Sequence, residues 1–257
     1  MQIVTNEPHV KRNRLIAQIL FIVSLVILIG GLIFTNTIAL STNALMIVPC
    51  IVMPIGLITT LISVRLTNQY VRPPHPEVAI REGVRGLSRD GILYNYVAPV
   101  NHVLVAPYGV FTLTTRLQDS RFKIEGDKWT SWKARGPLAP LFLFLKQEGL
   151  GDPFKDAASE AEAIQALVDK ALPLANIKVQ PIVVFTSTRA TLEVIDPTIP
   201  VVHADPKQKP SLKNQLRDEK RRDDAALLTA EQIEAIDDAI LARMSQKQRE
   251  SQLVEEV

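Results

Sequence analysis

Two long apolar runs near the amino terminus dominate the hydropathy pattern of the chain. Residues 15–34 are apolar except for Gln18, Ser24 and two glycines, and residues 44–64 are again largely apolar. A helix rises about 1.5 Å per residue, so about 20 residues cross the roughly 30 Å hydrocarbon core of a bilayer. The apolar part of a secretory signal peptide has only about 7–15 residues. The pattern therefore predicts a transmembrane hairpin over residues 15–65, with helices at 15–34 and 44–64.

Positive charges flank the outer ends of this hairpin. Lys11, Arg12 and Arg14 precede the first run, Arg65 and Arg72 follow the second, and the segment between the runs has no charge. By the positive-inside rule, both termini lie in the cytoplasm, with residues 1–14 as a cytoplasmic N-terminus of a multi-pass protein in the cell (plasma) membrane. Neither run contains an ionisable Asp, Glu, Lys, Arg or His, although such residues usually mark ion or substrate pathways. We interpret the hairpin as an anchor in the lipid bilayer.

A Pro-rich linker, residues 66–76, separates the hairpin from a region of alternating helix and strand patterns, residues 77–204. Apolar side chains recur at helical spacing in residues 77–87 and 157–172. Strand patterns, which are β-branched or continuous apolar runs bounded by turn residues, occupy residues 92–97, 102–106, 110–116 and 179–185. The alternation of the two patterns predicts an α/β domain with a mixed central sheet and helices packed on it.

Shorter patterns add further elements. Residues 121–125 alternate with a period of two, and a Gly-Asp turn leads them towards Trp129 and Trp132, which indicates a second hairpin. Residues 192–195 and 201–202 are two more strand candidates. The apolar run at residues 138–145 fits either a strand or a helix.

The composition changes to mixed charge from residue 205. Residues 212–224 interleave basic and acidic side chains, which is typical of a solvated helix. Thr229 and Gln232 form a capping-box pattern that opens an amphipathic helix, and residues 245–257 are expected to fray. We therefore predict a charged helical C-terminal tail over residues 205–257.

The overall composition excludes some classes of function. The formal net charge of the 257 residues is +2, which argues against a strongly basic protein that coats nucleic acid. The single cysteine, Cys50, lies inside the second apolar run. A disulfide framework and a cysteine-based metal site are therefore excluded.

Residues 99–117 resemble the core of the nuclease-related domain (NERD) family, a branch of the PD-(D/E)XK nuclease fold. In that family an Asp-His-hydrophobic run leads through a Pro-x-Gly turn into a strand that ends in Glu-x-Lys. Here Asn101 and His102 begin the run, Pro107-Tyr108-Gly109 form the turn, and Thr114 and Arg116 end the strand. The resemblance extends over residues 77–203 and includes the hairpin ending in Trp129 and the late apolar strand ending in Phe185. It implies a cytoplasmic, restriction-endonuclease-like domain after the hairpin.

The resemblance also implies which residues occupy the catalytic positions. They are Asn101, Thr114 and Arg116, together with an acidic residue of the first helix, Glu77 or Glu82. Nucleases of this fold need two carboxylates to hold Mg²⁺ and a lysine near the attacking water. Asn101 and Thr114 carry no charge, and arginine keeps its proton at any ordinary pH. The motif is therefore degenerate, and we predict no bound cofactor.

Two hypotheses of function follow. The preferred one is a non-catalytic module that uses the nuclease-like scaffold for binding or assembly at the cytoplasmic membrane face, with the bilayer and a protein or nucleic acid as partners. The alternative is a divergent nuclease acting on DNA or RNA, with Mg²⁺ held by the relocated carboxylates of Asp119 and Glu125. The basic residues that could then contact phosphates are Arg81, Arg85, Arg89, Arg116, Arg121 and Lys123.

Overall fold

The computed structural model describes residues 1–37, 42–97, 99–131, 151–222 and 227–255. The chain forms two compact units. We refer to the first, which consists of Met1–Asn6 and Pro76–Val257, as the sheet domain, and to the second, Glu7–His75, as the hairpin.

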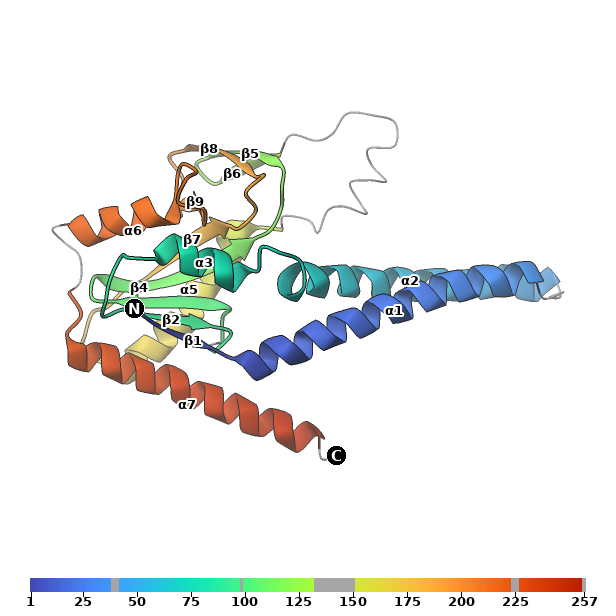
Figure 1. The fold of residues 1–257 in the computed structure, drawn as a ribbon, viewed down its shortest axis with the longest axis horizontal. Helices are drawn as coiled ribbons and strands as arrows, with labels where there is room; N and C mark the ends of the chain where they lie inside the picture. The colour runs from blue at the N-terminus through green and yellow to red at the C-terminus, as the bar shows by residue number, and fades with distance from the viewer. Residues whose placement is uncertain (38–41, 98, 132–150, 223–226, 256–257) are drawn as a thin grey trace. The chain divides into compact units, whose positions relative to one another are not determined.

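A six-stranded mixed sheet forms the centre of the sheet domain (Figure 1). Its strands, in spatial order, are β1 (Gln2–Thr5), β2 (Ile92–Asn95), β3 (His102–Ala106), β4 (Gly109–Arg116), β7 (Val179–Phe185) and β9 (Val201–His203). β3 is antiparallel to both β2 and β4, whereas β1, β7 and β9 each pair in parallel with a neighbour. The predicted mixed sheet is confirmed, with all four of its predicted strands adjacent.

The connections follow from local chemistry. A tight turn at Pro107-Tyr108 joins β3 to β4, and Gly109 begins β4 with a φ of +144°, a conformation that side chains other than glycine rarely adopt. The parallel pairing of β4 with β7 requires a crossover, which contains α5 (Pro153–Ala171). Asp152 caps this helix by accepting a hydrogen bond from the Lys155 backbone N–H at 3.1 Å.

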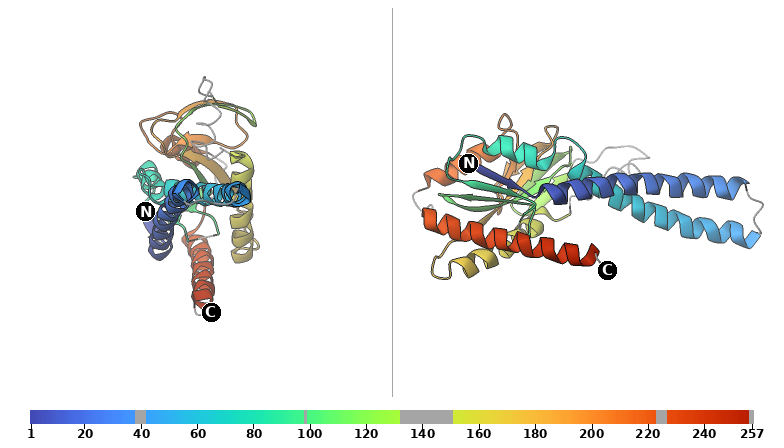
Figure 2. Two further views of the ribbon diagram at one scale, coloured as in Figure 1. Left: turned by 90° about the vertical axis from the view of Figure 1, so that its right-hand side faces the viewer. Right: turned by 60° about the horizontal axis from the view of Figure 1, so that its bottom comes forward.

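Helices cover both faces of the sheet (Figures 1 and 2). On one face, α3 (Pro76–Val84) and α6 (Leu212–Arg221) share a buried apolar core with the strands, including Ile80, Leu104 and Leu216. On the other, α5 and α7 (Ala230–Glu255) pack through Ile164 and Ile240 against Val103 and Val105. Neighbouring side chains of one strand point to opposite faces, so β3 serves both cores.

A second, three-stranded sheet has the order β6-β5-β8, with β5 (Arg121–Glu125), β6 (Lys128–Ser131) and β8 (Thr191–Ile195) (Figure 1). Trp129 of β6 contacts the rings of Phe122, Phe154 and Phe185, which ties this sheet to α5 and β7. The predicted hairpin ending in Trp129 is confirmed. Trp132 and the ambiguous run at residues 138–145 lie outside the described residues.

The N-terminal residues belong to the sheet domain, contrary to the prediction of a separate polar segment. Gln2–Thr5 pairs in parallel with β2, and Val4 packs against the core on the α5 side. The strand forms because its backbone completes hydrogen bonds along the edge of β2, for example from the Gln2 N–H to the Gly91 carbonyl at 2.9 Å.

The C-terminal residues are helical, as predicted, but they pack on the sheet and are not a detached tail. Leu212 and Leu216 of α6 and Ile236 and Ile240 of α7 are fully buried, because each helix presents an apolar stripe to the sheet. The capping box is confirmed, since the Gln232 N–H donates to Thr229 Oγ1 and the Thr229 N–H donates to Gln232 Oε1. α7 continues to Glu255, past the point where fraying was expected.

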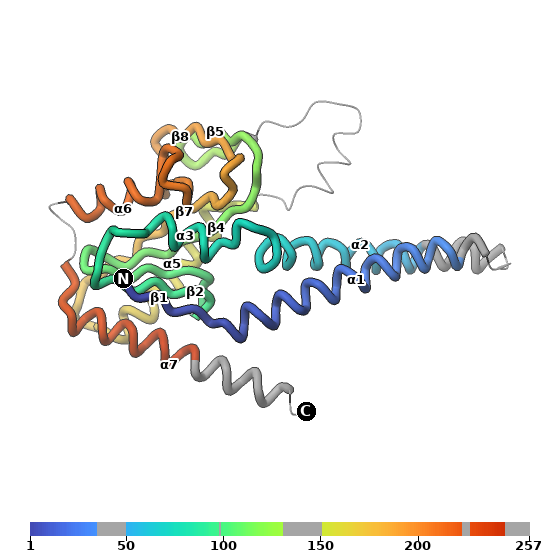
Figure 3. The backbone as a smooth tube through the Cα atoms, in the orientation of Figure 1, coloured from blue at the N-terminus to red at the C-terminus, as the bar shows by residue number. Residues whose placement is uncertain are grey.

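The hairpin consists of two antiparallel helices, α1 (Glu7–Thr37) and α2 (Thr42–Tyr70), which lie side by side (Figure 3). Both are long and apolar enough to cross a membrane, over Glu7–Phe34 and Cys50–Tyr70. Most of their large apolar side chains are exposed, unlike those of a core helix in a water-soluble protein. Small residues at every seventh position of α1, Ala17, Ser24 and Gly31, line the contact between the helices.

Candidate functional site

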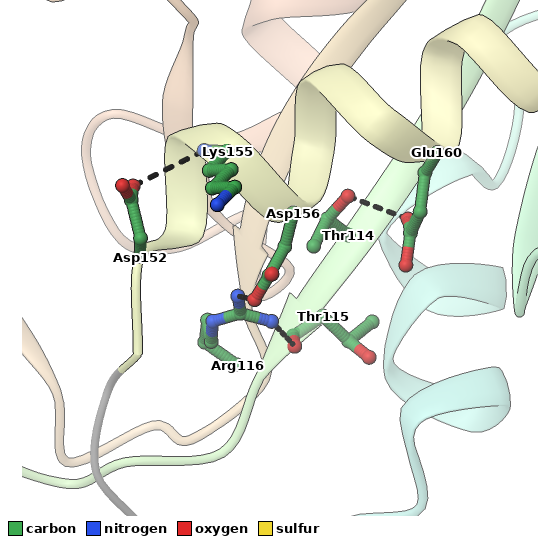
Figure 4. Close-up of polar contacts among 7 residues, drawn as sticks. All are labelled: Thr114, Thr115, Arg116, Asp152, Lys155, Asp156 and Glu160. Atoms are coloured by element: carbon green, nitrogen blue, oxygen red, sulfur yellow. Dashed lines mark hydrogen bonds and ion pairs between the residues drawn. The ribbon is translucent and has the colours of Figure 1, made fainter.

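A polar cluster joins the end of β4 to the first turns of α5 (Figure 4). Thr114 is 2% exposed, and its hydroxyl donates a hydrogen bond to Glu160 Oε2 at 2.6 Å. Asp156 and Glu160 are four residues apart, so both side chains lie on the same face of α5. Thr114 and Arg116 are two residues apart on β4 and point to that face of the sheet. The geometry therefore gathers one hydroxyl, one guanidinium and two carboxylates.

Arg116 holds this cluster together. Its Nη2 forms an ion pair with Asp156 Oδ2, and its Nη1 donates to the Thr115 carbonyl oxygen at 3.1 Å. The Arg116 side chain is 14% exposed, whereas that of Asp156 is 55% exposed. The permanent positive charge of arginine is thus neutralised at the edge of the cluster.

Burial sets the protonation of Glu160. Desolvation raises the pKa of this carboxyl above its ordinary value, and the negative charge of Asp156 raises it further. The hydrogen bond from Thr114 and the positive charge of Arg116 act in the opposite direction but do not cancel the effect of burial. Glu160 therefore takes up a proton more readily than an exposed glutamate does.

The structure places the four predicted site residues in three locations. Thr114 and Arg116 belong to the polar cluster. Asn101 directly precedes β3, the strand next to β4, and its carbonyl oxygen accepts a hydrogen bond from the Tyr96 N–H. Glu77 lies on α3, which packs on the other face of the sheet, and its Oε2 accepts a hydrogen bond from the Tyr96 hydroxyl at 3.4 Å. Glu77 therefore does not join the cluster.

The alternative first-helix carboxylate also lies elsewhere. Glu82, on α3, pairs at 3.5 Å with Arg85, which directly follows the helix, and both side chains are more than half exposed. Such a pair contributes little to stability because water screens it. Glu82 is therefore a helix-surface residue.

A second polar network surrounds His102. Its Nδ1 lies 2.9 Å from Asn95 Oδ1, and the Asn95 Nδ2 donates to Thr5 Oγ1 at 3.2 Å. We assign the proton of the ring to Nδ1, since it faces an oxygen acceptor. Complete burial lowers the pKa of His102 to about 3, so the imidazole is neutral in the folded protein. This histidine connects β1, β2 and β3.

Tyr96 links this network to α3. Its ring meets that of His102 edge-on, with the centroids 5.0 Å apart. The residue has a φ of +59°, which a side chain other than glycine adopts at an energetic cost. Its backbone N–H donates to the Asn101 carbonyl oxygen at 2.6 Å. The turn that precedes β3 is thereby fixed.

The carboxylates expected to substitute by relocation do not converge on Thr114. Asp119 pairs with Arg189 at 3.6 Å, and Glu125 pairs with Lys123 at 3.2 Å on β5 of the small sheet. Asp156 and Glu160, which we did not predict, take that place. The sequence does contain an Asp-Pro helix start followed by two acidic residues four positions apart. The side chains that these two acids contact, however, lie 40 or more positions away in the chain.

The predicted basic face is divided among several elements. Arg85, Lys123 and Arg116 each pair with a carboxylate. Arg81 belongs to α3 and Arg121 to β5, in different layers of the domain. The prediction of a continuous phosphate-binding face is therefore not supported by the positions of these residues.

The cluster does not fit a Mg²⁺ ion. Within the described residues, no three His, Cys, Asp or Glu side chains gather to hold a metal. Mg²⁺ needs free oxygen ligands in near-octahedral geometry, but Asp156 is engaged by Arg116 and Glu160 by Thr114. A guanidinium supplies the positive charge that these two carboxylates require.

Comparison with protein-family models, with curated proteins and with solved structures gave no match. The resemblance to the NERD family stays a prediction that rests on the residues quoted for it.

Proposed function

We propose that this chain is a membrane-anchored, non-catalytic module that uses a NERD-like scaffold for binding or assembly at the cytoplasmic face of the membrane. One observation carries the proposal. The residue at the position of the family's lysine, Arg116, is locked in an ion pair with Asp156. A guanidinium keeps its proton at any ordinary pH, so it cannot accept one from water, and its positive charge takes the place of a bound cation.

The order of the elements supports the proposed scaffold. Between Pro76 and Phe185, strands β2, β3, β4 and β7 belong to the main sheet. Helix α3 precedes β2 in the chain, and helix α5 lies between β4 and β7. These are the elements that the resemblance implies. Asn101 directly precedes β3, and the adjacent strand β4 carries Thr114 and Arg116. Function must nevertheless be argued from the site, because one fold serves many chemistries.

The division of the chain supports the proposed orientation. The sheet domain contains Met1–Asn6, before the hairpin, and Pro76–Val257, after it. A hairpin that crosses a membrane twice returns both of its ends to the same side, and this division agrees with such a topology. The cations at these ends, and the uncharged segment between the helices, favour the cytoplasmic side.

A metal-binding and cleavage experiment tests the non-catalytic part. The full chain, purified in detergent, is expected to cleave neither DNA nor RNA with Mg²⁺ or Mn²⁺, and to show no Mn²⁺ binding in calorimetry. The triple variant Asn101→Asp, Thr114→Glu, Arg116→Lys would supply the family's charges and is expected to bind Mn²⁺. Its matched control is Asn214→Asp, Thr188→Glu, Arg217→Lys, which makes the same changes at exposed positions. Cleavage by the wild-type chain would overturn the proposal.

One observation favours the alternative, a divergent nuclease. Asp156 and Glu160 do converge, and the raised pKa of Glu160 is typical of carboxyls tuned for acid–base chemistry. If wild-type cleavage were found, Glu160→Gln should abolish it, whereas Glu162→Gln, at an exposed position of the same helix, should not.

A further inference from the structure

The hairpin carries a strongly asymmetric charge at its base. Between Pro8 and Pro76 the chain has no Asp or Glu, but it has five cations, Lys11, Arg12, Arg14, Arg65 and Arg72. We refer to these five residues as the basic collar. The net charge of the whole chain is +2, so the remainder of the chain carries −3. The collar is therefore where the chain can attract a negatively charged partner.

Contacts within the hairpin bring two residues of the collar, Arg14 and Arg65, to one level. Ser63 Oγ donates to the Ala17 carbonyl oxygen at 3.4 Å, which sets Arg65 and Arg14 only two and three residues from that contact. At about 1.5 Å per residue, these two side chains start within about 5 Å of it along the helices. Arg14 Nε also donates to the Tyr70 carbonyl oxygen at 3.1 Å, which joins the start of α1 to the end of α2.

The collar is accessible. Lys11, Arg12, Arg65 and Arg72 are exposed within the hairpin, and Arg14 is half-buried. The positions nearest to it on the apolar side are also exposed, with Leu15 at 56% and Ile62 at 49%. An occupant of this surface must therefore be negatively charged at one end and apolar at the other.

We infer that the basic collar binds the headgroups of anionic phospholipids, whose acyl chains lie along the apolar exterior of α1 and α2. An acidic peptide would satisfy the charges but leave the adjacent apolar side chains without a matching partner. Clusters of four or more Lys and Arg next to a membrane segment attract acidic lipids. This inference rests on the proposed anchoring, because the lipid must surround an inserted hairpin.

A comparison of how strongly anionic and zwitterionic lipids associate with the chain tests this inference directly. The full chain is reconstituted in phosphatidylcholine bilayers, and the association of spin-labelled phosphatidylglycerol is compared with that of spin-labelled phosphatidylcholine. One collar contact should favour phosphatidylglycerol about fivefold at low salt. The preference should fall in Lys11→Gln/Arg12→Gln/Arg65→Gln/Arg72→Gln, which keeps only the half-buried Arg14, and should come close to unity at high salt. Added glycerol phosphate, which lacks acyl chains, should not compete.

A matched control removes four exposed cations from the sheet domain, as Arg81→Gln/Arg89→Gln/Lys128→Gln/Arg217→Gln, and should keep the preference. Equal association of both lipids with the wild-type chain would overturn the inference, as would a preference lost only in the control. Carbonate extraction distinguishes a failure of the collar inference from a failure of the proposed anchoring. A chain that stays in the membrane without lipid preference refutes the collar alone, whereas a chain that is extracted refutes the anchoring as well.

Discussion

The Thr114 hydroxyl donates a 2.6 Å hydrogen bond to Glu160 Oε2 and so joins β4 to α5 across 46 positions of the chain. Removing the donor leaves a half-buried carboxyl without its partner, and the cost of such a loss is at most about 1–3 kcal/mol. Thr114→Val, which keeps the shape of the side chain, should lower the free energy of unfolding by that amount. Denaturant unfolding of the full chain in detergent, followed by tryptophan fluorescence, measures the change.

The neighbouring Thr115 provides the control. It lies on the same strand and is half-buried, so Thr115→Val should change the free energy of unfolding by less than about 0.5 kcal/mol. Equal effects of the two substitutions would mean that the Thr114–Glu160 hydrogen bond contributes nothing specific.

The pH dependence of stability should report on His102. Burial lowers its pKa to about 3, whereas the unfolded chain has an ordinary value near 6.5. Below 6.5 the unfolded state therefore binds a proton that the folded state does not. The contribution of His102 to the free energy of unfolding is fully present above pH 6.5. It decreases by about 1.4 kcal/mol per pH unit as the pH falls from 6.5 towards 3.

The variant His102→Gln keeps a donor for Asn95 but cannot be protonated in this range. The difference in unfolding free energy between wild type and variant should therefore change with pH below 6.5 and be constant above it. A difference that is constant from pH 7 to pH 4 would show that His102 is not buried in its neutral form.

How much could be predicted depended on the separation of interacting residues along the chain. The Thr229–Gln232 capping box spans three residues and was predicted correctly, as was the strand that carries Thr114 and Arg116. The partners of those two side chains lie on α5, and only the parallel crossover to β7 brings them together. No local pattern contains that information.

The same reasoning explains the missed strand β1. Four residues are too few for a periodic pattern, and Gln2 pairs with Ile92, about ninety positions later. Its short polar context and the nearby cations suggested a free N-terminus. Without β1, the edge of β2 would have unpaired backbone groups. Gln2–Thr5 forms a strand there because the pairing supplies backbone hydrogen bonds to that edge.

Adjacent glycines of α1 provide a test of the hairpin. A Cβ built on Gly31 would lie 2.6 Å from Val52 Cγ1, whereas one built on Gly30 has no atom within 4 Å. Gly31→Val should therefore separate α1 from α2, while Gly30→Val should be tolerated. Disulfide trapping between cysteines placed on the two helices, in detergent, measures their proximity. Equal trapping in both variants would contradict the described packing of the helices.

The proposed orientation can be tested by labelling cysteines in intact cells. The background is Cys50→Ser, which removes the only native thiol. Leu174→Cys reports on the sheet domain because residue 174 is fully exposed, and Ser41→Cys reports on the segment between the two apolar runs. With both termini in the cytoplasm, an impermeant maleimide should label Ser41→Cys in intact cells but Leu174→Cys only after permeabilisation. Labelling of Leu174→Cys in intact cells would place the sheet domain outside the cytoplasm, and the orientation proposed from the basic residues would be wrong.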